Sequence, residues 1–320
     1  METSQAELAQ VKTLWSLGRR ADAVALLSRL AARDDPLALV TLAELSWTGQ
    51  GVPQHLGRAR ELFRRAGAAG LFGAASYYTN LLASGIAGPR DWALAMARLG
   101  EEASTDPHRR EVLDLVCRMA LTSEGDPATP PEGEQLCRSP EMHLYRELFS
   151  SEECDHLLAV AESGYQPSIV NDAAGRPVRD PIRTSDGSAI HWLIEDPAIH
   201  ALNRRLAAAS GTAYEQGEPM QVLRYRQGQE YKPHFDFART SENSRVTTAL
   251  AYLNDDYEGG ETWFLKAQIK VRGRKGDVLV FRSMGPDGRV DPMSEHAGLP
   301  VTSGVKYLAS RWIREGRWIP

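Results

Sequence analysis

The chain has 320 residues, a length that is typical of two domains rather than one. Its composition, 42% hydrophobic and 25% charged, is that of a globular protein and excludes extended disorder. The net charge of −5 is spread along the chain, so it gives no reason to expect nucleic acid or a membrane as a partner.

The cysteines and the N-terminal residues indicate a reducing compartment. Cys117, Cys137 and Cys154 are too few for a disulfide framework, and their spacing fits no zinc site. The opening METSQAELAQVKTLW lacks the basic start and apolar run of a secretory signal. No stretch approaches the roughly 18 to 20 apolar residues that a membrane span needs. We therefore expect a cytoplasmic protein.

Residues 10 to about 120 are rich in Ala, Leu and Arg at helical spacing and repeat themselves at a shift of 36 positions. Two helices joined by a Gly/Pro turn occupy about this length, and small residues at fixed places let paired helices approach closely. The positions that match at this shift are Gly49 and Gly85, Pro53 and Pro89, Ala38 and Ala74, Leu45 and Leu81, and the series Ala23, Ala59 and Ala95.

This pattern resembles Sel1-like repeats, relatives of the tetratricopeptide repeat. The family's Gly-x-Gly-Val turn is found at Gly49–Val52 and is followed by the helical Ala59, whereas Ile86 and Ala87 depart from it in the second copy. The resemblance implies an all-α helical-repeat domain over residues 1–125. Such stacks present a surface to a protein or peptide partner, or they pack on the rest of the chain and stabilise it. Both alternatives stay open.

A proline-rich stretch separates this region from a part with strand texture. Residues 126–140 are predicted to be a linker, and residues 141–320 a second domain. Helices are expected from Ser150, which caps an acidic first turn, and over 197–209. The strand-like runs, separated by Gly and Pro turns, are MQVLRY, TTALAYLN, GGETWFL, IKVRG, DVLVF and VKYLASRWI. They predict a double-sheet jelly roll or barrel. The EGGET turn at 258–262 is expected to be a hairpin with glycine at positive φ and no catalytic role.

A metal site is indicated by HFD within QGQEYKPHFDF. His234 and Asp236 are two residues apart, and on a strand such residues point to the same face. His296, in DPMSEHAGLP, is the candidate third ligand. Two imidazoles and one carboxylate form the facial triad of non-haem iron(II) oxygenases, which leaves positions open for substrate and oxygen. A chain with eight histidines can also contain this spacing by chance.

Lys306 adds a second indication. In VKYLASRWI it shares one strand face with Leu308, Ser310 and Trp312, and the apolar members suggest that this face is buried. A buried ammonium is costly without a carboxylate partner, and no acidic residue lies near it in sequence. The far carboxylate of 2-oxoglutarate would meet that need. Alternatively, Lys306 reaches solvent at a sheet edge.

Residues 141–320 also resemble the catalytic domain of prolyl 4-hydroxylases. The matching stretches, in the family's order, are LFSSEECDHL, RTSDGS, EPMQVLRYRQGQEYKPHFDF, TALAYLNDDYEGGETWF, GRKGDVLVF and DPMSEHAGLPVTSGVKYLASRWIRE. The resemblance implies a double-stranded β-helix with helices packed on one sheet. It also implies iron(II), 2-oxoglutarate and O₂ as cofactor and cosubstrates, with ascorbate as reductant.

The resemblance assigns a role to each matching position. It implies that the triad ligates iron, that Lys306 binds the C5 carboxylate of 2-oxoglutarate, and that Tyr225 and Tyr252 lend hydroxyls to the cosubstrate. The positions that it implies for substrate are Tyr231, which packs on the target proline, Glu218, Arg245 and Trp312, which line the groove, and Arg183 with Ser185, in a loop that closes over the peptide. Taken singly, the aromatic residues among these could equally be core residues.

Three functions stay open. The first is hydroxylation of a prolyl residue in a cytosolic protein or peptide, coupled to oxidative decarboxylation of 2-oxoglutarate to succinate and CO₂, and Tyr231, Arg245 and Trp312 favour it. The second is the same chemistry on a free amino acid or a natural-product intermediate. The third is a non-catalytic repeat scaffold with a relic oxygenase domain. The presence of all four principal site residues argues against it, because a relic would be expected to have lost one. Collagen-like substrates are not implied, since the chain lacks the paired cysteines of secretory members.

Overall fold

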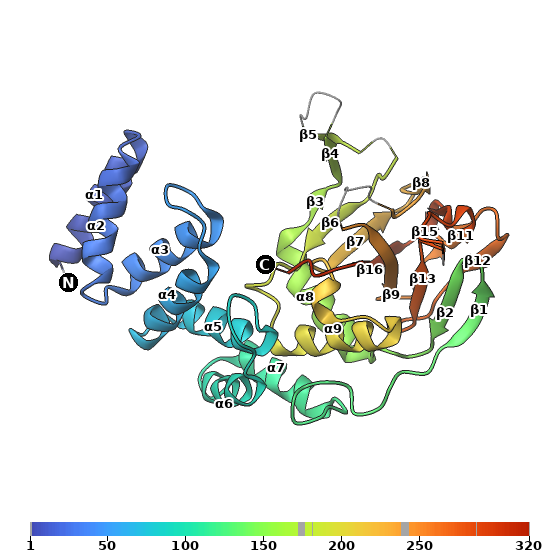
Figure 1. Ribbon diagram of the computed structural model, residues 1–320, viewed down its shortest axis with the longest axis horizontal. Helices are drawn as coiled ribbons and strands as arrows, with labels where there is room; N and C mark the ends of the chain where they lie inside the picture. Colours follow the sequence, from blue (N-terminus) through green and yellow to red (C-terminus); the bar gives the residue numbers. More distant parts are fainter. Residues whose placement is uncertain (1, 172–176, 181, 238–242, 286, 320) are drawn as a thin grey trace. The chain divides into compact units, whose positions relative to one another are not determined.

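The computed structural model describes residues 2–171, 177–180, 182–237, 243–285 and 287–319, which form two compact units (Figure 1). The first unit comprises residues up to Asp114 together with Trp192–Pro197, and the second comprises Leu115–His191 and Ala198–Ile319. No helix among the described residues is both long and apolar enough to cross a bilayer. The three cysteines are free thiols.

The first unit is all-helical, as predicted. Its helices, in chain order, are α1 (Glu2–Ser16), α2 (Arg20–Ala31), α3 (Pro36–Thr48), α4 (Leu56–Ala68), α5 (Phe72–Ser84), α6 (Trp92–Glu102) and α7 (Pro107–Arg118), the last of which continues past the boundary of the unit. The bounds of α3 and α5 differ by the same 36 positions at both ends, and so do the first residues of α4 and α6. The helical repeat expected from the sequence is therefore confirmed.

Equivalent residues begin and end the repeated helices. Gly49 and Gly85 end α3 and α5 in the left-handed conformation, with φ of 76° and 72°, which only glycine adopts without strain. His55 and Asp91 cap α4 and α6 by accepting a hydrogen bond from the backbone N–H three residues on. The matched alanines of the repeat are fully or almost fully buried at Ala23, Ala38, Ala59, Ala74 and Ala95.

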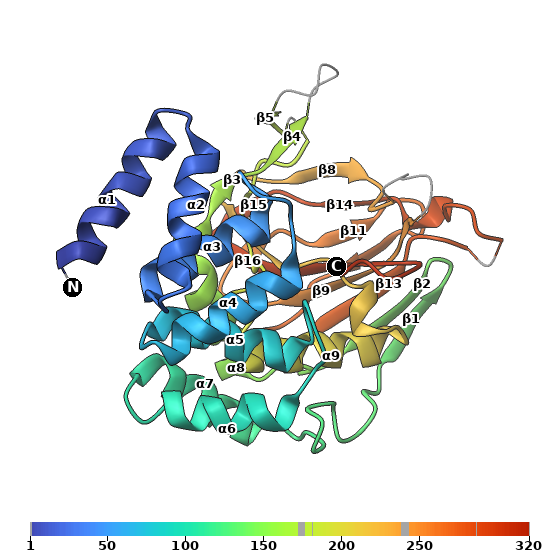
Figure 2. The same ribbon diagram turned by 60° about the vertical axis from the view of Figure 1, so that its left-hand side comes forward.

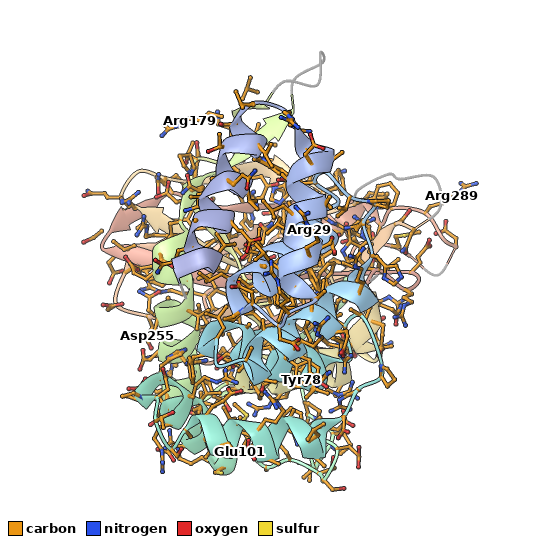
Figure 3. The ribbon with its side chains drawn as sticks, turned by 90° about the vertical axis from the view of Figure 1, so that its left-hand side faces the viewer. Arg29, Tyr78, Glu101, Arg179, Asp255 and Arg289 are labelled. Carbon is orange, nitrogen blue, oxygen red and sulfur yellow. The ribbon has the colours of Figure 1, made fainter. Side chains whose placement is uncertain are left out.

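A buried polar cluster joins the last helices of this unit. The guanidinium of Arg109 on α7 lies 2.6 Å from the carboxylate of Glu102 on α6, and both side chains are more than nine-tenths buried. The same carboxylate accepts a hydrogen bond from the hydroxyl of Thr79 on α5. Nearby, the guanidinium of Arg98 stacks over the ring of Tyr78, 5.0 Å from its centre. In Figure 3 the labelled Tyr78 marks α5.

The second unit contains two antiparallel sheets that face each other (Figure 2). The eight-stranded sheet has, in spatial order, β1 (Glu134–Arg138), β2 (Glu141–Tyr145), β13 (Val278–Arg282), β9 (Arg245–Tyr252), β16 (Val305–Arg314), β7 (Gln221–Arg226), β6 (Asp186–Ala189) and β3 (Gln166–Pro167). The four-stranded sheet has β12 (Ile269–Val271), β11 (Thr262–Phe264), β14 (His296–Gly298) and β8 (Tyr231–His234). Two short pairs add β10 (Glu258–Gly259) with β15 (Val301–Ser303), and β4 (Ile169–Asn171) with β5 (Pro177–Arg179).

The large sheet buries both of its faces, because successive side chains of a strand point to opposite sides. On β9, Ala249 and Ala251 pack against α8 (Ser151–Ala161) and α9 (Pro197–Ser210). Leu250 and Tyr252 instead pack into the core between the two sheets. The predicted jelly roll with helices on one sheet is therefore confirmed.

Local sequence signals position α8, and tertiary pairing explains two differences from expectation. The predicted cap at Ser150 is present as a capping box with Glu153. Within the predicted linker, Glu134–Arg138 forms β1, an edge strand that main-chain pairing with β2 stabilises despite its few apolar residues. The EGGET turn is not a hairpin, since β10 pairs with β15 and β11 pairs with β12 and β14. Its two glycines, with φ of 71° and 68°, carry the chain from the β10–β15 pair into the four-stranded sheet.

Candidate active site

The three predicted metal ligands meet on neighbouring strands. His296 begins β14 and is the register partner of His234 at the end of β8, so antiparallel pairing places two residues far apart in sequence side by side. Asp236 follows β8, and its two carboxylate oxygens lie 3.5 Å from Nε2 of His234 and 3.6 Å from Nε2 of His296. The three side chains form a group that could hold a metal ion.

Hydrogen bonds fix the tautomers of both imidazoles. Nδ1 of His234 lies 2.8 Å from the carbonyl oxygen of Lys232, and Nδ1 of His296 lies 3.0 Å from that of Ser294. A carbonyl oxygen only accepts, so each Nδ1 carries a proton, and Nε2 is the nitrogen of each ring that can ligate a metal. Both Nε2 atoms face Asp236. This donor set, two imidazoles and one carboxylate, fits iron(II).

The electrostatics of the group keep its donors in the states that a metal needs. Burial by itself would raise the pKa of Asp236, but His296, His234 and the hydroxyl of Thr248 hold that pKa below its usual range. Burial lowers the pKa of His296 to about 4, against the opposing attraction of Asp236. The carboxylate is therefore ionised and His296 neutral at neutral pH.

Lys306 lies in the same pocket with its charge buried. It is 3% exposed, so the alternative in which it reaches solvent is wrong. Nζ donates a hydrogen bond to the carbonyl oxygen of Gly260, 2.7 Å away, and lies 5.7 Å and 5.5 Å from the ring centres of Tyr225 and Tyr252. Among the described residues no carboxylate pairs with it, and burial lowers its pKa to about 8. A buried cation with a hydrogen bond but no counter-ion is suited to bind an anion.

The two tyrosines predicted to serve the cosubstrate differ in position. Tyr225 lines the pocket as the register partner of Lys306, and its hydroxyl is hydrogen-bonded to Ser185. Tyr252 is fully buried in the core between the sheets and does not line the pocket. Its hydroxyl lies 3.1 Å from the hydroxyl of Thr262, which does line it. Tyr252 is therefore linked to the pocket through Thr262 and through Lys306, and does not itself line it.

The pocket lies between the two sheets and draws residues from both. The alternation of side chains along β16 predicted that Lys306, Leu308, Ser310 and Trp312 share one face, and this face lines the pocket. Its lining residues are Arg183, Leu223, Tyr225, Tyr231, His234, Asp236, Leu250, Thr262, His296, Gly298, Leu299, Lys306, Leu308, Ser310 and Trp312. An ammonium and a metal-binding triad thus share one small, largely apolar cavity.

Tyr231 and Arg183 line the pocket next to His234. The ring of Tyr231 stacks on the imidazole of His234, with ring centres 3.4 Å apart and planes 16° from parallel. Arg183 forms a β-bridge with Tyr231 and holds its guanidinium 5.5 Å from the ring centre. The two residues predicted to contact substrate thus lie together, and one of them stacks on a predicted metal ligand.

The remaining predicted groove residues form a cluster beside the pocket. Glu218 is buried, and its carboxylate accepts two hydrogen bonds from Arg245, at 2.6 Å and 2.7 Å, and one from Arg314 at 2.8 Å. The guanidinium of Arg245 stacks 4.0 Å from the ring centre of Trp312, which lines the pocket. Glu218 therefore holds the two arginines in place, and Trp312 is the member of this cluster that faces the pocket.

Three residues of the site were not identified from the sequence. Thr248 donates a hydrogen bond to Asp236, Thr262 lies between Tyr252 and the pocket, and the carbonyl oxygen of Gly260 accepts from Lys306. The last two lie in the EGGET stretch, for which no catalytic role was expected. Alternation along TTALAYLN places Thr248 on the face of Tyr252, which is the one signal that could have indicated it.

Comparison with known proteins agrees with this site. The family model of the 2OG-Fe(II) oxygenase superfamily matches residues 220–314, a range that contains the triad and Lys306. Prolyl 4-hydroxylase 1 of Arabidopsis thaliana is 40% identical over 202 residues, which cover 57% of this chain and 71% of that protein. The chain belongs to the prolyl 4-hydroxylase family. It is accordingly a dioxygenase that depends on iron(II), 2-oxoglutarate and O₂.

Further relatives match a similar share of the chain. Prolyl 4-hydroxylase 2 of Arabidopsis thaliana is 33% identical over 221 residues, which cover 60% of this chain and 73% of that protein. Among solved structures, the viral collagen prolyl hydroxylase of Paramecium bursaria Chlorella virus-1, in complex with 2-oxoglutarate, is 28% identical with a TM-score of 0.43. That match covers 56% of this chain and 98% of that one. These matches leave more than a third of this chain uncovered.

Proposed function

We propose that this dioxygenase hydroxylates a prolyl residue in a protein or peptide and couples the reaction to decarboxylation of 2-oxoglutarate to succinate and CO₂. The observation that carries the proposal is the buried ammonium of Lys306, which pairs with no carboxylate of the described residues and lies in the same cavity as His234, Asp236 and His296. The names of the relatives, which are prolyl 4-hydroxylases, support the choice of substrate.

The proposed roles follow from the donors of each side chain. His234, Asp236 and His296 would hold iron(II), which supplies the oxidising chemistry when bound. Lys306 would pair with the far carboxylate of 2-oxoglutarate, and Tyr225 would donate a hydrogen bond to it. The leucines that line the pocket make it less polar, which would strengthen these contacts.

Tyr231 and Trp312 are the proposed contacts to the target proline. A prolyl ring has no N–H group in a peptide, so it is recognised by packing against aromatic faces rather than by donation. Tyr231 and Trp312 both line the pocket that contains His234. Arg183, whose guanidinium lies 5.5 Å from the ring centre of Tyr231, would donate hydrogen bonds to carbonyl oxygens of the peptide.

The helical unit is proposed to bind the protein that carries the target proline. Phe72 on α5 and Leu94 on α6 support this, since their side chains are 41% and 42% exposed. In the full-length chain, Phe72→Ser is expected to raise KM for a protein substrate and to leave KM for a short peptide unchanged. An equal effect on both substrates would contradict this role.

The central test measures succinate and hydroxyproline formed from proline-containing peptides with iron(II), 2-oxoglutarate and O₂. His234→Ala should abolish both products, and Lys306→Ala should chiefly raise the 2-oxoglutarate concentration required. His143→Ala, which alters a histidine of β2 outside the pocket, is the matched control and should leave turnover unchanged. Hydroxylation of free proline but of no peptide would overturn the substrate class. Full activity in His234→Ala would overturn the site.

A further inference from the structure

Thr248 lies behind the metal-binding group, on the large sheet. It belongs to β9, is 1% exposed, and shares the strand face of Leu250, which lines the pocket. Its hydroxyl donates a 2.8 Å hydrogen bond to Oδ2 of Asp236. The register partners of Thr248 are Trp312 on β16 and Phe281 on β13, so strands on both sides fix its backbone.

Each member of the triad has one contact that orients it. The two imidazoles are oriented by carbonyl oxygens close to them in sequence, those of Lys232 and Ser294. Asp236 lies beyond the last residue of β8, so strand pairing does not fix its side chain. Apart from the imidazoles, Thr248 supplies the one hydrogen bond to this carboxylate among the described residues.

We propose that Thr248 is a positioning residue of the metal site. Its hydroxyl holds Oδ2 and so fixes the rotation of the carboxylate relative to the two Nε2 atoms. Threonine suits this role because its branched side chain is stiff on a strand, which keeps the hydroxyl in one place. Partners that orient metal ligands typically contribute 10- to 100-fold to metal affinity. The inference rests on the metal site of the proposed function and not on the identity of its substrate.

A purely structural role predicts a different result. If the hydroxyl merely satisfied a buried carboxylate, its removal would lower the stability of the metal-free chain without a specific loss of metal affinity. Thr247, its neighbour on β9, provides a matched control. It is 3% exposed and points to the opposite face of the sheet, away from Asp236.

The experiment is a cobalt(II) titration of the metal-free full-length chain, followed by visible absorption, with thermal unfolding of each variant as a control. Thr248→Val keeps the shape of the side chain and should weaken cobalt affinity about tenfold or more. Thr248→Ser should retain the cobalt affinity of the unaltered chain, whereas Thr248→Ala should weaken it as much as Thr248→Val does. Thr247→Val should leave it unchanged.

Several outcomes would overturn the inference. These are affinity of Thr248→Val within twofold of the unaltered chain, equal affinity of the serine and alanine variants, or an equal loss in Thr247→Val. If Thr248→Val does not fold, the serine and alanine pair decides, because these two variants differ only in the hydroxyl. Cobalt binding that is insensitive to Thr248 overturns this inference alone, whereas no cobalt binding by the unaltered chain overturns the metal site of the proposed function as well.

Discussion

The titration of Lys306 is predicted to control the affinity of the chain for 2-oxoglutarate. Burial lowers the pKa of its ammonium from 10.5 to about 8, against a weaker opposing effect of Glu261. Pairing with a carboxylate requires the charged form and therefore raises this pKa when 2-oxoglutarate binds. Binding above pH 8 must then take up a proton, while binding below pH 8 need not.

The size of the effect follows from that pKa. At pH 7 about nine in ten free chains already carry the charge, so affinity is close to its maximum. At pH 9 about one in ten does, so affinity should fall about tenfold, or about 1.4 kcal/mol. The fall in affinity depends on the burial of Lys306, because a lysine with its ordinary pKa would stay charged, and its affinity for 2-oxoglutarate unchanged, between pH 7 and pH 9.

The assay is calorimetric titration of 2-oxoglutarate into the manganese-loaded chain, in two buffers that differ in their enthalpy of protonation. Proton uptake should rise from about 0.1 per molecule bound at pH 7 to about 0.9 at pH 9. Lys306→Met should bind more weakly at pH 7 and show no uptake that depends on pH. Absence of proton uptake at pH 9, or the same uptake in Lys306→Met, would refute the reasoning.

The remaining predictions concern the helical unit. The buried guanidinium of Arg109 lies 2.6 Å from the carboxylate of Glu102, and Glu102→Gln removes this counter-ion. The substitution should lower the free energy of unfolding, measured by urea denaturation, by about 3–5 kcal/mol. A loss below about 1 kcal/mol would contradict the importance of this pair. Gly67→Ala would place its Cβ 2.7 Å from Cα of Ala75 and should destabilise by about 1–3 kcal/mol. In Gly100→Ala the added Cβ meets nothing within 4 Å, so this variant should be more stable than the unaltered chain by up to about 1 kcal/mol. Equal changes in the unfolding temperatures of the two glycine variants, measured by calorimetry, would refute the packing argument.

Patterns within single segments were enough to predict most of the fold. The shift of 36 positions placed the helices and their glycine ends, because each repeat carries its own turn and small-residue signals. Alternation along VKYLASRWI placed Lys306 and Trp312 on one buried face, since the period of a strand is two. The edge strand β1 escaped prediction, because its stabilisation comes from main-chain pairing with β2 rather than from apolar residues.

The metal-binding group shows most clearly what the sequence alone indicates and what requires the tertiary structure. The sequence by itself put His234 and Asp236 on one face, because two residues two apart on a strand need no other segment. Only the tertiary structure decided that His296 pairs with His234, that Thr248 holds Asp236, and that the carbonyl of Gly260 meets Lys306. Those contacts depend on the register between strands and on a turn that changes sheets. Register is set jointly by all the strands of a sheet, so no local pattern contains it.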